Sequence, residues 1–421
     1  MTCLFSFVSF SPLFAGVMSD VVRDRDSSSL CCMHPGVRLR DKYRAGSGEG
    51  ASAIFLLRWG GRNPVFSVGK GPAPEEHSPA TNRERSWPIM ERRNGAEIDP
   101  QITDVLLARK TLEGRIRHTP TERSAPLSQA CGGEVYLKLE NQQLCGSFKV
   151  RGALNRMERL TPEERRRGVV TASSGNHAQG VALAAVELGV AATVCVPGVC
   201  PETKKQAILT RGGSRVTLKV VGHYYDDAES EAARLAREEG LTYLSSFEDP
   251  WVIAGAGTLG LELFFDQPDL DLLLVPAGGG GLINGVAIAA KALRPEVEIW
   301  GVQSTASMPW VASWPGGTVV DVTYEDSLAD GLMGYIPQSL VDLAKKRVSG
   351  FLAVEEKDIA RAMAFLHREH HQVVEGSGAV GVAALLAGKI DVTGRRVGVV
   401  ISGGNVDEAV LLSVLGTALD G

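Results

Sequence analysis

Short apolar stretches alternate with longer amphipathic or alanine-rich stretches through most of the chain after residue 98. The short stretches predict buried strands, and the longer ones predict helices. In a first series, strands are predicted at 168–172, 191–196, 215–221 and 241–245, with helices at 177–188, 202–211 and 225–239 between them. Strands that alternate with helices indicate parallel βαβ units.

A second series of the same kind begins near the middle of the chain. It predicts strands at 270–276, 297–303 and 396–401, and a helix at 282–293. In open α/β sheets, ligands bind beyond the carboxyl ends of the strands. Glycine- or serine-rich loops follow three of the predicted strands, at 173–177, 277–281 and 402–405. These loops are therefore the first places to look for a binding site.

Composition narrows the class of protein. The chain is 44% hydrophobic and 22% charged with a net charge of −5, which is typical of a globular protein and argues against nucleic acid as a main partner. The basic run 165–167 fits the end of a helix capped by Thr161. No apolar run reaches the ~18 residues that suggest a membrane span. Seven cysteines without metal-ligand spacing favour a reduced, cytoplasmic compartment, and we expect no metal site.

Residues 1–89 differ from the rest, because they mix Ser, Gly, Arg and Pro with apolar patches and show no sustained period. The apolar opening is weak evidence for a signal peptide, since it lacks a leading positive segment and a clear cleavage site. An alternative is that translation starts at Met90. We expect an irregular N-terminal extension, disordered or outside the true coding start, and assign no chemistry to it.

A fourth loop carries a lysine among glycines. Lys149 lies in the run Gly-Ser-Phe-Lys-Val-Arg-Gly-Ala at 146–153. An enzyme that forms a Schiff base needs such a lysine, because its amine must lose a proton near neutral pH and the backbone must approach a flat cofactor. Most lysines are solvated surface charges, so the run gains meaning only together with the other loops.

The glycine loop 277–281 joins a predicted buried strand to a helix. Successive glycines let backbone N–H groups turn toward one anion, and the helix N-terminus adds its positive dipole. A tight turn without a ligand and a dinucleotide site are the alternatives. A dinucleotide site has the spacing Gly-x-Gly-x-x-Gly, followed by an acidic residue after the next strand. Counted from Gly279, the second glycine is Gly281, but the third position is Asn284. The next predicted strand ends in Gln303, which is not acidic. NAD is therefore disfavoured.

The remaining two loops offer hydroxyl and amide groups. Ser402 follows a strand and suits a hydrogen bond to a ring nitrogen that stays unprotonated. The loop 173–177 supplies hydroxyls, the Asn176 amide and a helix N-terminus, which suit a carboxylate or a phenolic oxygen. A simple helix cap, with His177 as a structural histidine, is the alternative.

Together the four loops resemble the fold-type II pyridoxal-phosphate enzymes, and within them the serine/threonine dehydratase and serine racemase family. The resemblance covers roughly residues 100–415. The motifs, in the family's order, are SFKVRGA at 147–153, SSGNHAQG at 173–180, GGGG at 278–281 and SGGN at 402–405.

The resemblance implies a role for each loop. Lys149 would bind the aldehyde of pyridoxal 5′-phosphate as a Schiff base and move the Cα proton, Phe148 would pack near the ring, and Asn176 would face the 3′ oxygen. The phosphate would lie on Gly278, Gly279, Gly280 and Gly281, with Ser402 at the ring nitrogen. The substrate carboxylate would be held by Ser173, Asn176 and His177.

The implied fold is α/β with two domains, each an open, largely parallel sheet flanked by helices. The large, cofactor-binding domain would comprise residues 90–167 and 249–421, and a small domain at 168–248 would be inserted into it. The family also suggests a homodimer.

The implied reaction is β-elimination of water from L-threonine or L-serine, giving a 2-oxo acid and ammonia. Ser174 favours a serine racemase instead, because its hydroxyl could return a proton to the opposite face of Cα. The racemase's small-domain arginine and asparagine align with Glu229 and Phe247, and its metal ligands with Gln303, Ser307 and Pro309. These differences favour the dehydratase. A protein that binds the cofactor without activity is a less favoured alternative, because Lys149, Ser174 and Ser402 are all present.

Overall fold

The structure, a computed structural model, describes residues 98–417. The predicted extension at 1–89, and the part of the predicted large domain at 90–97, lie outside the described residues. No helix among residues 98–417 is both long enough and apolar enough to cross a membrane.

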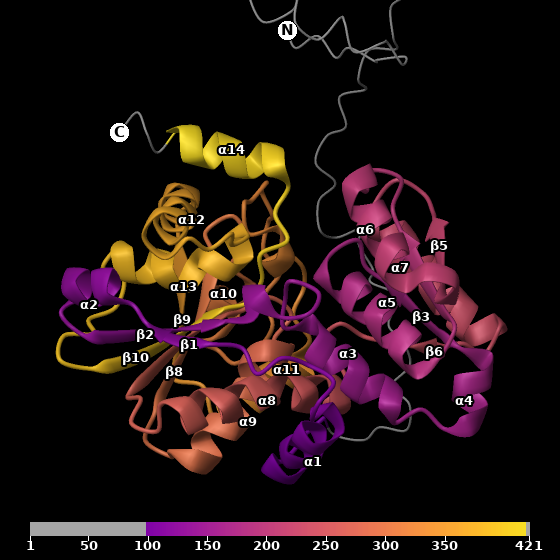
Figure 1. Cartoon of the computed structure of the whole chain (residues 1–421), viewed down its shortest axis with the longest axis horizontal. Coiled ribbons are helices and arrows are strands. Elements are labelled where there is room, and N and C mark those ends of the chain that lie inside the picture. The colour runs from indigo at the N-terminus through magenta and orange to yellow at the C-terminus, as the bar shows by residue number, and fades with distance from the viewer. Residues whose placement is uncertain (1–97, 418–421) are drawn as a thin grey trace, which may run out of the picture. The chain divides into compact units, whose positions relative to one another are not determined.

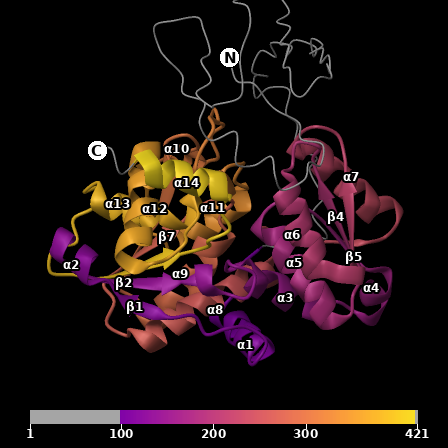
Figure 2. The same ribbon diagram turned by 45° about the horizontal axis from the view of Figure 1, so that its top comes forward.

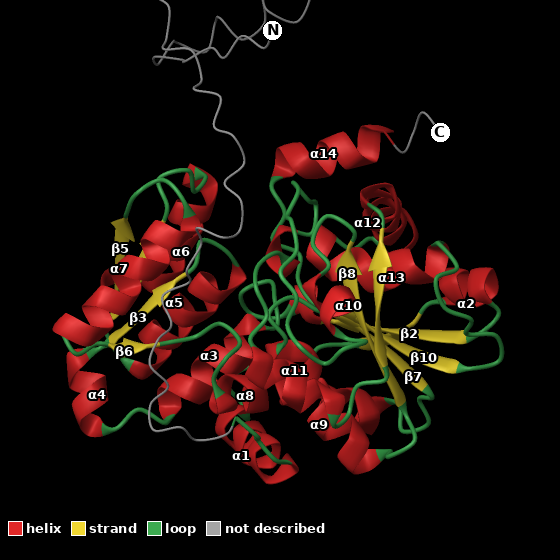
Figure 3. Cartoon of the chain, turned by 180° about the vertical axis from the view of Figure 1, so that it is seen from behind, coloured by secondary structure: helices red, strands yellow, loops and turns green. Residues whose placement is uncertain are grey.

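The larger of two sheets has six strands in the order β1-β2-β10-β7-β8-β9. Their bounds are Thr121–Arg123 for β1, Glu134–Leu139 for β2, Arg396–Ile401 for β10, Leu272–Pro276 for β7, Glu298–Ser304 for β8 and Gly350–Val354 for β9. Every neighbouring pair is parallel except β1 with β2. Figure 3 shows strands β2, β10, β7 and β8 of this sheet. The strands β7 and β10 lie in the middle, and all residues of β7 are buried. That burial explains why β7 is a continuous apolar run rather than an alternating one.

The smaller sheet has four parallel strands in the order β5-β4-β3-β6. The strands are β3 at Val169–Ala172, β4 at Ala192–Val196, β5 at Val216–Val220 and β6 at Thr242–Tyr243. The helices between them are α5 at Asn176–Leu188, α6 at Glu202–Gly212 and α7 at Tyr225–Glu238 (Figures 1 and 2). Alternate residues of β3 and β4 pack against α5 and α6 on one face and against α7 on the other.

The predicted βα alternation is confirmed in both sheets, and most element ends agree within one or two residues. Strand β6 is shorter than the predicted 241–245. The Ser245 hydroxyl accepts the backbone N–H groups of Phe247 and Glu248, so the chain turns there instead of continuing the strand.

The remaining elements complete the layers around both sheets. The α-helices are α1 Ile102–Leu112, α2 Ala125–Cys131, α3 Lys149–Glu158, α4 Pro162–Arg167, α8 Pro250–Asp266, α9 Gly281–Leu293, α10 Pro309–Ser313, α11 Gln338–Lys345, α12 Glu356–His370, α13 Gly376–Leu386 and α14 Glu408–Thr417. Short 3-10 turns lie at Glu140–Gln142, Gly213–Arg215 and Asp330–Leu332. Thr161 caps α4 as predicted, and the basic run forms its last turn.

Helix α8 packs closely against both α3 and α9. A Cβ on Gly255 of α8 would lie 2.4 Å from the Arg151 carbonyl oxygen of α3. A Cβ on Gly285 of α9 would lie 2.3 Å from the Ile253 carbonyl oxygen of α8. Neither position has room for a side chain, so the three helices are held at a short, fixed separation. Because α3 begins at Lys149 and α9 at Gly281, this packing fixes two of the predicted loops relative to each other.

Candidate active site

Lys149 is the first residue of α3, and its loop is joined to the loop that follows β10. The Phe148 backbone N–H donates to the Ser402 carbonyl oxygen at 3.1 Å, and Ser147 forms an isolated β-bridge with Gly403. Two motifs that lie some 250 residues apart in the sequence are therefore in direct contact. Ser402 itself is buried.

The Lys149 amine lies in a poorly solvated position. Its Nζ donates to the Ser246 carbonyl oxygen at 3.0 Å. Burial lowers the pKa of Lys149 to about 8, and the nearby Glu375 carboxyl offsets part of that shift. Desolvation disfavours the charged form of an amine, so a sizeable fraction of Lys149 is neutral near physiological pH. A neutral amine is what attack on an aldehyde requires.

The glycine loop has the geometry of an anion site. The backbone N–H groups of Gly279, Gly280 and Gly281 have no hydrogen-bond acceptor within residues 98–417. They precede the N-terminus of α9, where the helix dipole favours negative charge. Gly280 has φ +104°, and a Cβ there would lie 2.5 Å from the Trp310 ring. The loop thus needs glycine for its backbone shape and leaves its donors available to a phosphate.

Phe247 covers the other side of the same loop. A Cβ on Gly279 would lie 2.5 Å from the Phe247 ring, and one on Gly281 would lie 2.9 Å from the Phe247 Cα. The Phe247 ring also packs edge-on against Tyr335, with ring centroids 5.9 Å apart. The sequence motif GGGG therefore allows close packing against Phe247 and also leaves backbone donors unpaired.

The loop after β3 and the first turn of α5 bring four predicted residues to the cavity, Ser173, Ser174, Asn176 and His177. The Ser173 hydroxyl accepts the Gly175 N–H at 3.3 Å, and the Ser174 side chain lies beside the Cys200 thiol. His177 is buried behind the loop, with Nε2 3.3 Å from the Leu244 carbonyl oxygen. Burial, with a smaller contribution from Lys149, lowers the pKa of His177 to about 3, so its imidazole is neutral.

Asn176 lies at the centre of a short chain of side-chain hydrogen bonds. Its Nδ2 donates to Glu375 Oε1 at 2.7 Å, and its Oδ1 accepts from Asn405 Nδ2 at 2.7 Å. Asn405 Nδ2 also donates to the Cys145 carbonyl oxygen at 2.8 Å. Burial raises the pKa of Glu375 to about 7, and the Asn176 hydrogen bond opposes that rise.

Sequence reasoning missed Glu375. It immediately precedes α13, in a stretch without hydrophobic periodicity that offers no chemical motif. The available signal was a single acidic residue between Val374 and an uncharged, glycine-rich helix. An acidic residue in such an apolar setting is buried more often than its type suggests, and a buried carboxyl needs a partner.

One cavity of about 1680 Å³ collects all of the predicted site residues. They line it together with Glu375, Phe247 and Asn405: Phe148, Lys149, Ser173, Ser174, Asn176, His177, Gly278, Gly279, Gly280, Gly281 and Ser402. The structure therefore brings all four motifs to a single place.

The positions aligned with the racemase metal ligands have another role. Gln303 Oε1 accepts the backbone N–H groups of Trp310 at 2.9 Å and Val311 at 3.3 Å, which fixes the start of α10. Trp310 in turn donates from Nε1 to the Gly278 carbonyl oxygen at 2.6 Å. Gln303 therefore supports the glycine loop from behind. No cluster of three or more His, Cys, Asp or Glu side chains suited to a metal ion occurs within residues 98–417.

Comparison with known proteins identifies the family. The sequence profile of a family described as "Pyridoxal-phosphate dependent enzyme" matches residues 112–403. The chain belongs to this family of pyridoxal-phosphate-dependent enzymes. The predicted recognition, the α/β fold class and the cofactor are confirmed.

Three relatives of this pyridoxal-phosphate-dependent enzyme narrow the comparison. An L-threonine ammonia-lyase of Thermotoga maritima is 46% identical over 308 residues, which are 73% of this chain and 76% of that protein. The structure of maize serine racemase has a TM-score of 0.71 and 30% identity, over 76% of this chain and 98% of that one. The structure of the processed form of threonine deaminase isoform 2 from Solanum lycopersicum has a TM-score of 0.70 and 33% identity, over 75% of this chain and 92% of that one.

The residues in the cavity fit pyridoxal phosphate. Unpaired backbone donors of the glycine loop suit its phosphate, and Lys149 supplies an amine that is partly neutral. Asn176 retains a second N–H for an oxygen acceptor, because only one is used by Glu375. Ser402 lies at the carboxyl end of β10, between the Lys149 loop and Glu375.

Proposed function

We propose that this enzyme is a threonine/serine dehydratase, which removes water from L-threonine or L-serine to give a 2-oxo acid and ammonia. The observation that carries the proposal is Lys149, a desolvated amine with a pKa of about 8 in the same cavity as the glycine loop and Asn176. The names of the relatives from Thermotoga maritima and Solanum lycopersicum agree with it.

The cofactor residues keep the roles expected from the sequence. Gly278, Gly279, Gly280 and Gly281 would hold the phosphate, Ser402 would face the ring nitrogen, and Asn176 would face the 3′ oxygen. Phe148 would pack beside the ring. Bound pyridoxal phosphate supplies an electron sink for the carbanion at the substrate Cα. A serine at the ring nitrogen accepts or donates one hydrogen bond and does not force protonation there, as a carboxylate would.

The substrate residues act from the loop after β3. We expect Ser173 through its hydroxyl, and Asn176 through its backbone N–H, to bind the substrate carboxylate. Because the His177 imidazole is neutral and bonded to Leu244, His177 contributes through its backbone N–H at the start of α5 rather than through a positive charge. Lys149, once released by the incoming amino acid, takes the Cα proton as general base.

Serine racemase is the second candidate. Ser174 lines the cavity and lies beside the Cys200 thiol, so its hydroxyl is placed to serve as an acid or base in addition to Lys149. The fold similarity to maize serine racemase supports this alternative. An inactive cofactor-binding protein is a weaker candidate, because the reactive amine and its desolvated setting are both retained.

The domain boundaries remain predictions, although the four-stranded sheet falls within the predicted small domain at 168–248. The homodimer, the cytoplasmic location and the absence of a nucleic-acid partner also remain predictions from the sequence. Cysteines 131, 145, 195 and 200 are unpaired, as a reduced compartment requires.

The test offers L-threonine, L-serine and D-serine separately to the full chain loaded with pyridoxal phosphate. Prompt release of 2-oxo acid from L-threonine or L-serine is expected, and the rates rank the two substrates. If neither releases 2-oxo acid, the dehydratase proposal fails, and chiral analysis of the recovered serine tests the racemase. The Ser174→Ala variant then separates the two, since it should abolish racemisation and spare elimination.

A further inference from the structure

Glu375 is a buried carboxyl that faces the cavity and is not used in the proposed reaction. Its side chain is 8% exposed, and it lines the same cavity as Lys149. Its Oε1 accepts from Asn176, and its Oε2, which makes no hydrogen bond within residues 98–417, is not among the fully buried polar atoms and is open to the cavity. A largely buried carboxyl with one oxygen open to the cavity can act on a group bound there.

The backbone holds Glu375 firmly against the Ser402 loop. Its N–H donates to the Gly403 carbonyl oxygen at 3.1 Å. A Cβ on Gly403 would lie 2.4 Å from Glu375 Oε1, so only glycine leaves room for the carboxyl. The carboxyl is therefore fixed between the residue that faces the ring nitrogen, Ser402, and the residue that faces the 3′ oxygen, Asn176.

The Asn176 amide has a defined orientation. Asn405 donates to its Oδ1, and that contact turns the amide NH₂ group toward Glu375. An amide NH₂ group has two donors, and Glu375 takes one of them. The second remains for the 3′ oxygen of pyridoxal phosphate, so the carboxyl and this oxygen would share one donor group.

The charges around Glu375 leave it without a permanent counter-ion. Lys149, Lys204 and Asp330 are the charged groups that act on it. Lys204 forms an ion pair with Asp330 at 2.9 Å, so these two largely cancel. Only Lys149 remains, and its nitrogen is the one that bonds to the cofactor. Positive charge at that nitrogen would favour the ionised form of the Glu375 carboxyl, and the carboxylate would in turn favour that positive charge.

We propose that Glu375 is a positioning residue whose carboxylate, held by the Asn176 amide, stabilises positive charge on the linkage between Lys149 and bound pyridoxal phosphate. Its negative charge keeps that linkage protonated to a higher pH than the linkage would reach beside a neutral residue. A protonated linkage is the more electrophilic form, so Glu375 favours exchange of Lys149 for the substrate amine. This inference rests on the proposed cofactor site and not on the identity of the substrate.

The experiment is a pH titration of the absorption bands of the bound cofactor in the full chain, without substrate. Glu375→Gln keeps the size of the side chain and an oxygen that accepts from Asn176, but it cannot ionise. We expect the titration midpoint to fall by about one pH unit or more, the usual effect of removing a carboxylate that acts on a nearby cation. Glu229→Gln is the matched control, because Glu229 lines the same cavity, also has a pKa raised by burial, and is hydrogen-bonded to tyrosines instead. We expect it to keep the wild-type midpoint.

A second variant separates charge from packing and covers the case in which Glu375→Gln does not fold. Glu375→Asp keeps the ionisable group and should lower the midpoint less than Glu375→Gln does, or leave it unchanged. Three results would each overturn the proposal. The midpoint could stay unchanged in Glu375→Gln, it could shift equally in Glu375→Asp and Glu375→Gln, or it could shift as much in Glu229→Gln. If wild type shows no cofactor band, the cofactor site fails and Glu375 loses its role with it. Normal bands with no 2-oxo acid release would overturn the dehydratase alone.

Discussion

Lys149 and Arg151 lie two residues apart at the start of α3, and their surroundings are opposite. Residues i and i+2 of a helix point in different directions, so Lys149 faces the cavity while Arg151 faces the interior between α3 and α8. The Arg151 side chain is fully buried. The two cations thus share one helical turn but not one environment.

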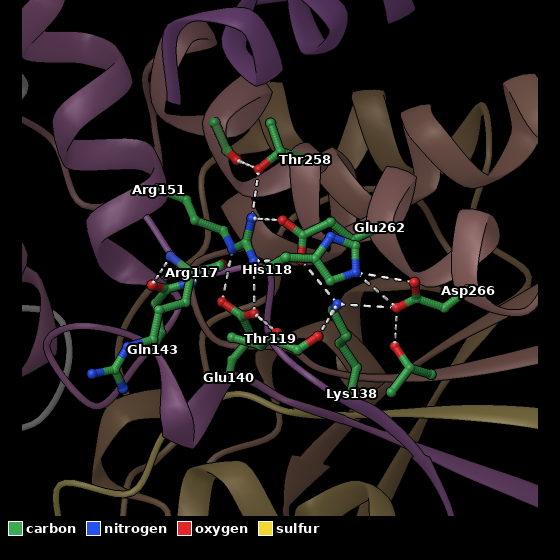
Figure 4. Close-up of polar contacts among 12 residues, drawn as sticks. Arg117, His118, Thr119, Lys138, Glu140, Gln143, Arg151, Thr258, Glu262 and Asp266 are labelled. Atoms are coloured by element: carbon green, nitrogen blue, oxygen red, sulfur yellow. Dashed lines mark hydrogen bonds and ion pairs between the residues drawn. The ribbon is translucent and has the colours of Figure 1, made fainter. Parts of the chain in front are cut away.

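Arg151 is held between two carboxylates. Its guanidinium donates to both oxygens of Glu140 at 2.8 and 2.9 Å and to both oxygens of Glu262 at 2.7 and 2.8 Å, with Thr258 at 3.0 Å (Figure 4). Lys138 joins the same cluster through Glu262 at 2.9 Å. The two carboxylates raise the pKa of Arg151 against the effect of burial, so it stays charged. This cluster fixes α3 to α8 and β2.

Lys149 has no such partner. A carbonyl oxygen accepts from its amine, and the carboxyl that acts on it, Glu375, has a pKa of about 7 and is only partly ionised. The difference shows how one helix serves two purposes. Ion pairs with two carboxylates keep Arg151 charged and let it hold α3 in place. Lys149 has no such ion pair, so it can lose its proton and react.

Substitution of Lys149, the reactive cation of the two, should have the largest effect on activity. Lys149→Ala removes both the amine that binds the cofactor and the general base. We expect 2-oxo acid release to fall by at least about 10³-fold, which is within the range for loss of a catalytic base. The loss could be larger than for a base alone, because Lys149 also binds the cofactor. Steady-state assays with L-threonine measure it. Lys291→Ala, a lysine outside the cavity, should keep wild-type activity. Comparable losses in both variants would mean that the effect is not specific to Lys149.

Substitution of Arg151, the structural cation of the two, should instead lower the stability of the fold. Arg151→Met leaves Glu140 and Glu262 buried opposite an apolar side chain, which we expect to lower the free energy of unfolding by about 3–5 kcal/mol. Urea unfolding of the full chain without cofactor measures it, because bound cofactor would add its own stabilisation. The exposed pair Arg166–Glu163 supplies the control. Arg166→Met should change stability by less than about 1 kcal/mol. Similar losses in the two variants would contradict the comparison.

The lowered pKa of Lys149 should control the pH dependence of cofactor capture. The neutral amine is the reactive form, and its fraction rises with pH until the pH passes the pKa of about 8. We expect the rate of cofactor capture by the cofactor-free chain to rise on the order of a hundredfold between about pH 6 and 9 and to level off there. Stopped-flow absorbance measures it. An ordinary lysine would give a rate that still rises steeply at about pH 9, and that result would show that burial does not lower the pKa of Lys149.

The smallest effect is expected in the glycine loop. Gly279→Ala places a methyl group 2.5 Å from the Phe247 ring, so the ring or the loop must move. We expect cofactor affinity to fall about tenfold, equivalent to about 1.4 kcal/mol, while Lys149 still reacts. Equilibrium titration with pyridoxal phosphate measures it. At Gly316 an added Cβ meets nothing within 4 Å, so Gly316→Ala should bind as wild type does. An affinity unchanged in Gly279→Ala would mean that the loop adapts without cost.

The sequence predicted most of the fold because buried parallel strands are continuous apolar runs and their loops carry distinctive residues. It also placed the four motifs at one site, since three of them follow strands of parallel sheets. It did not predict strands β1, β2 and β9 or several helices, among them α8, α12 and α13. Strand β1 has three residues and no apolar pattern, and the apolar residues of α13 occur on all faces.

The contacts between distant residues could not be predicted from one sequence. Asn176 and Glu375 are 199 residues apart, and Arg151 and Glu262 are 111 apart. Nothing in the spacing of either pair marks the two residues as partners. The neutral state of His177 likewise depends on its burial in the folded chain, which one sequence does not show.

The most direct test of the central role of Lys149 is chemical trapping. Two lysines within residues 98–417 line the cavity, Lys149 and Lys204. Borohydride reduction of the full chain loaded with pyridoxal phosphate converts the linkage to a stable secondary amine, and peptide mass spectrometry locates it. The account predicts the phosphopyridoxyl group on Lys149 alone. A group on Lys204, or on any other lysine in place of Lys149, would contradict it.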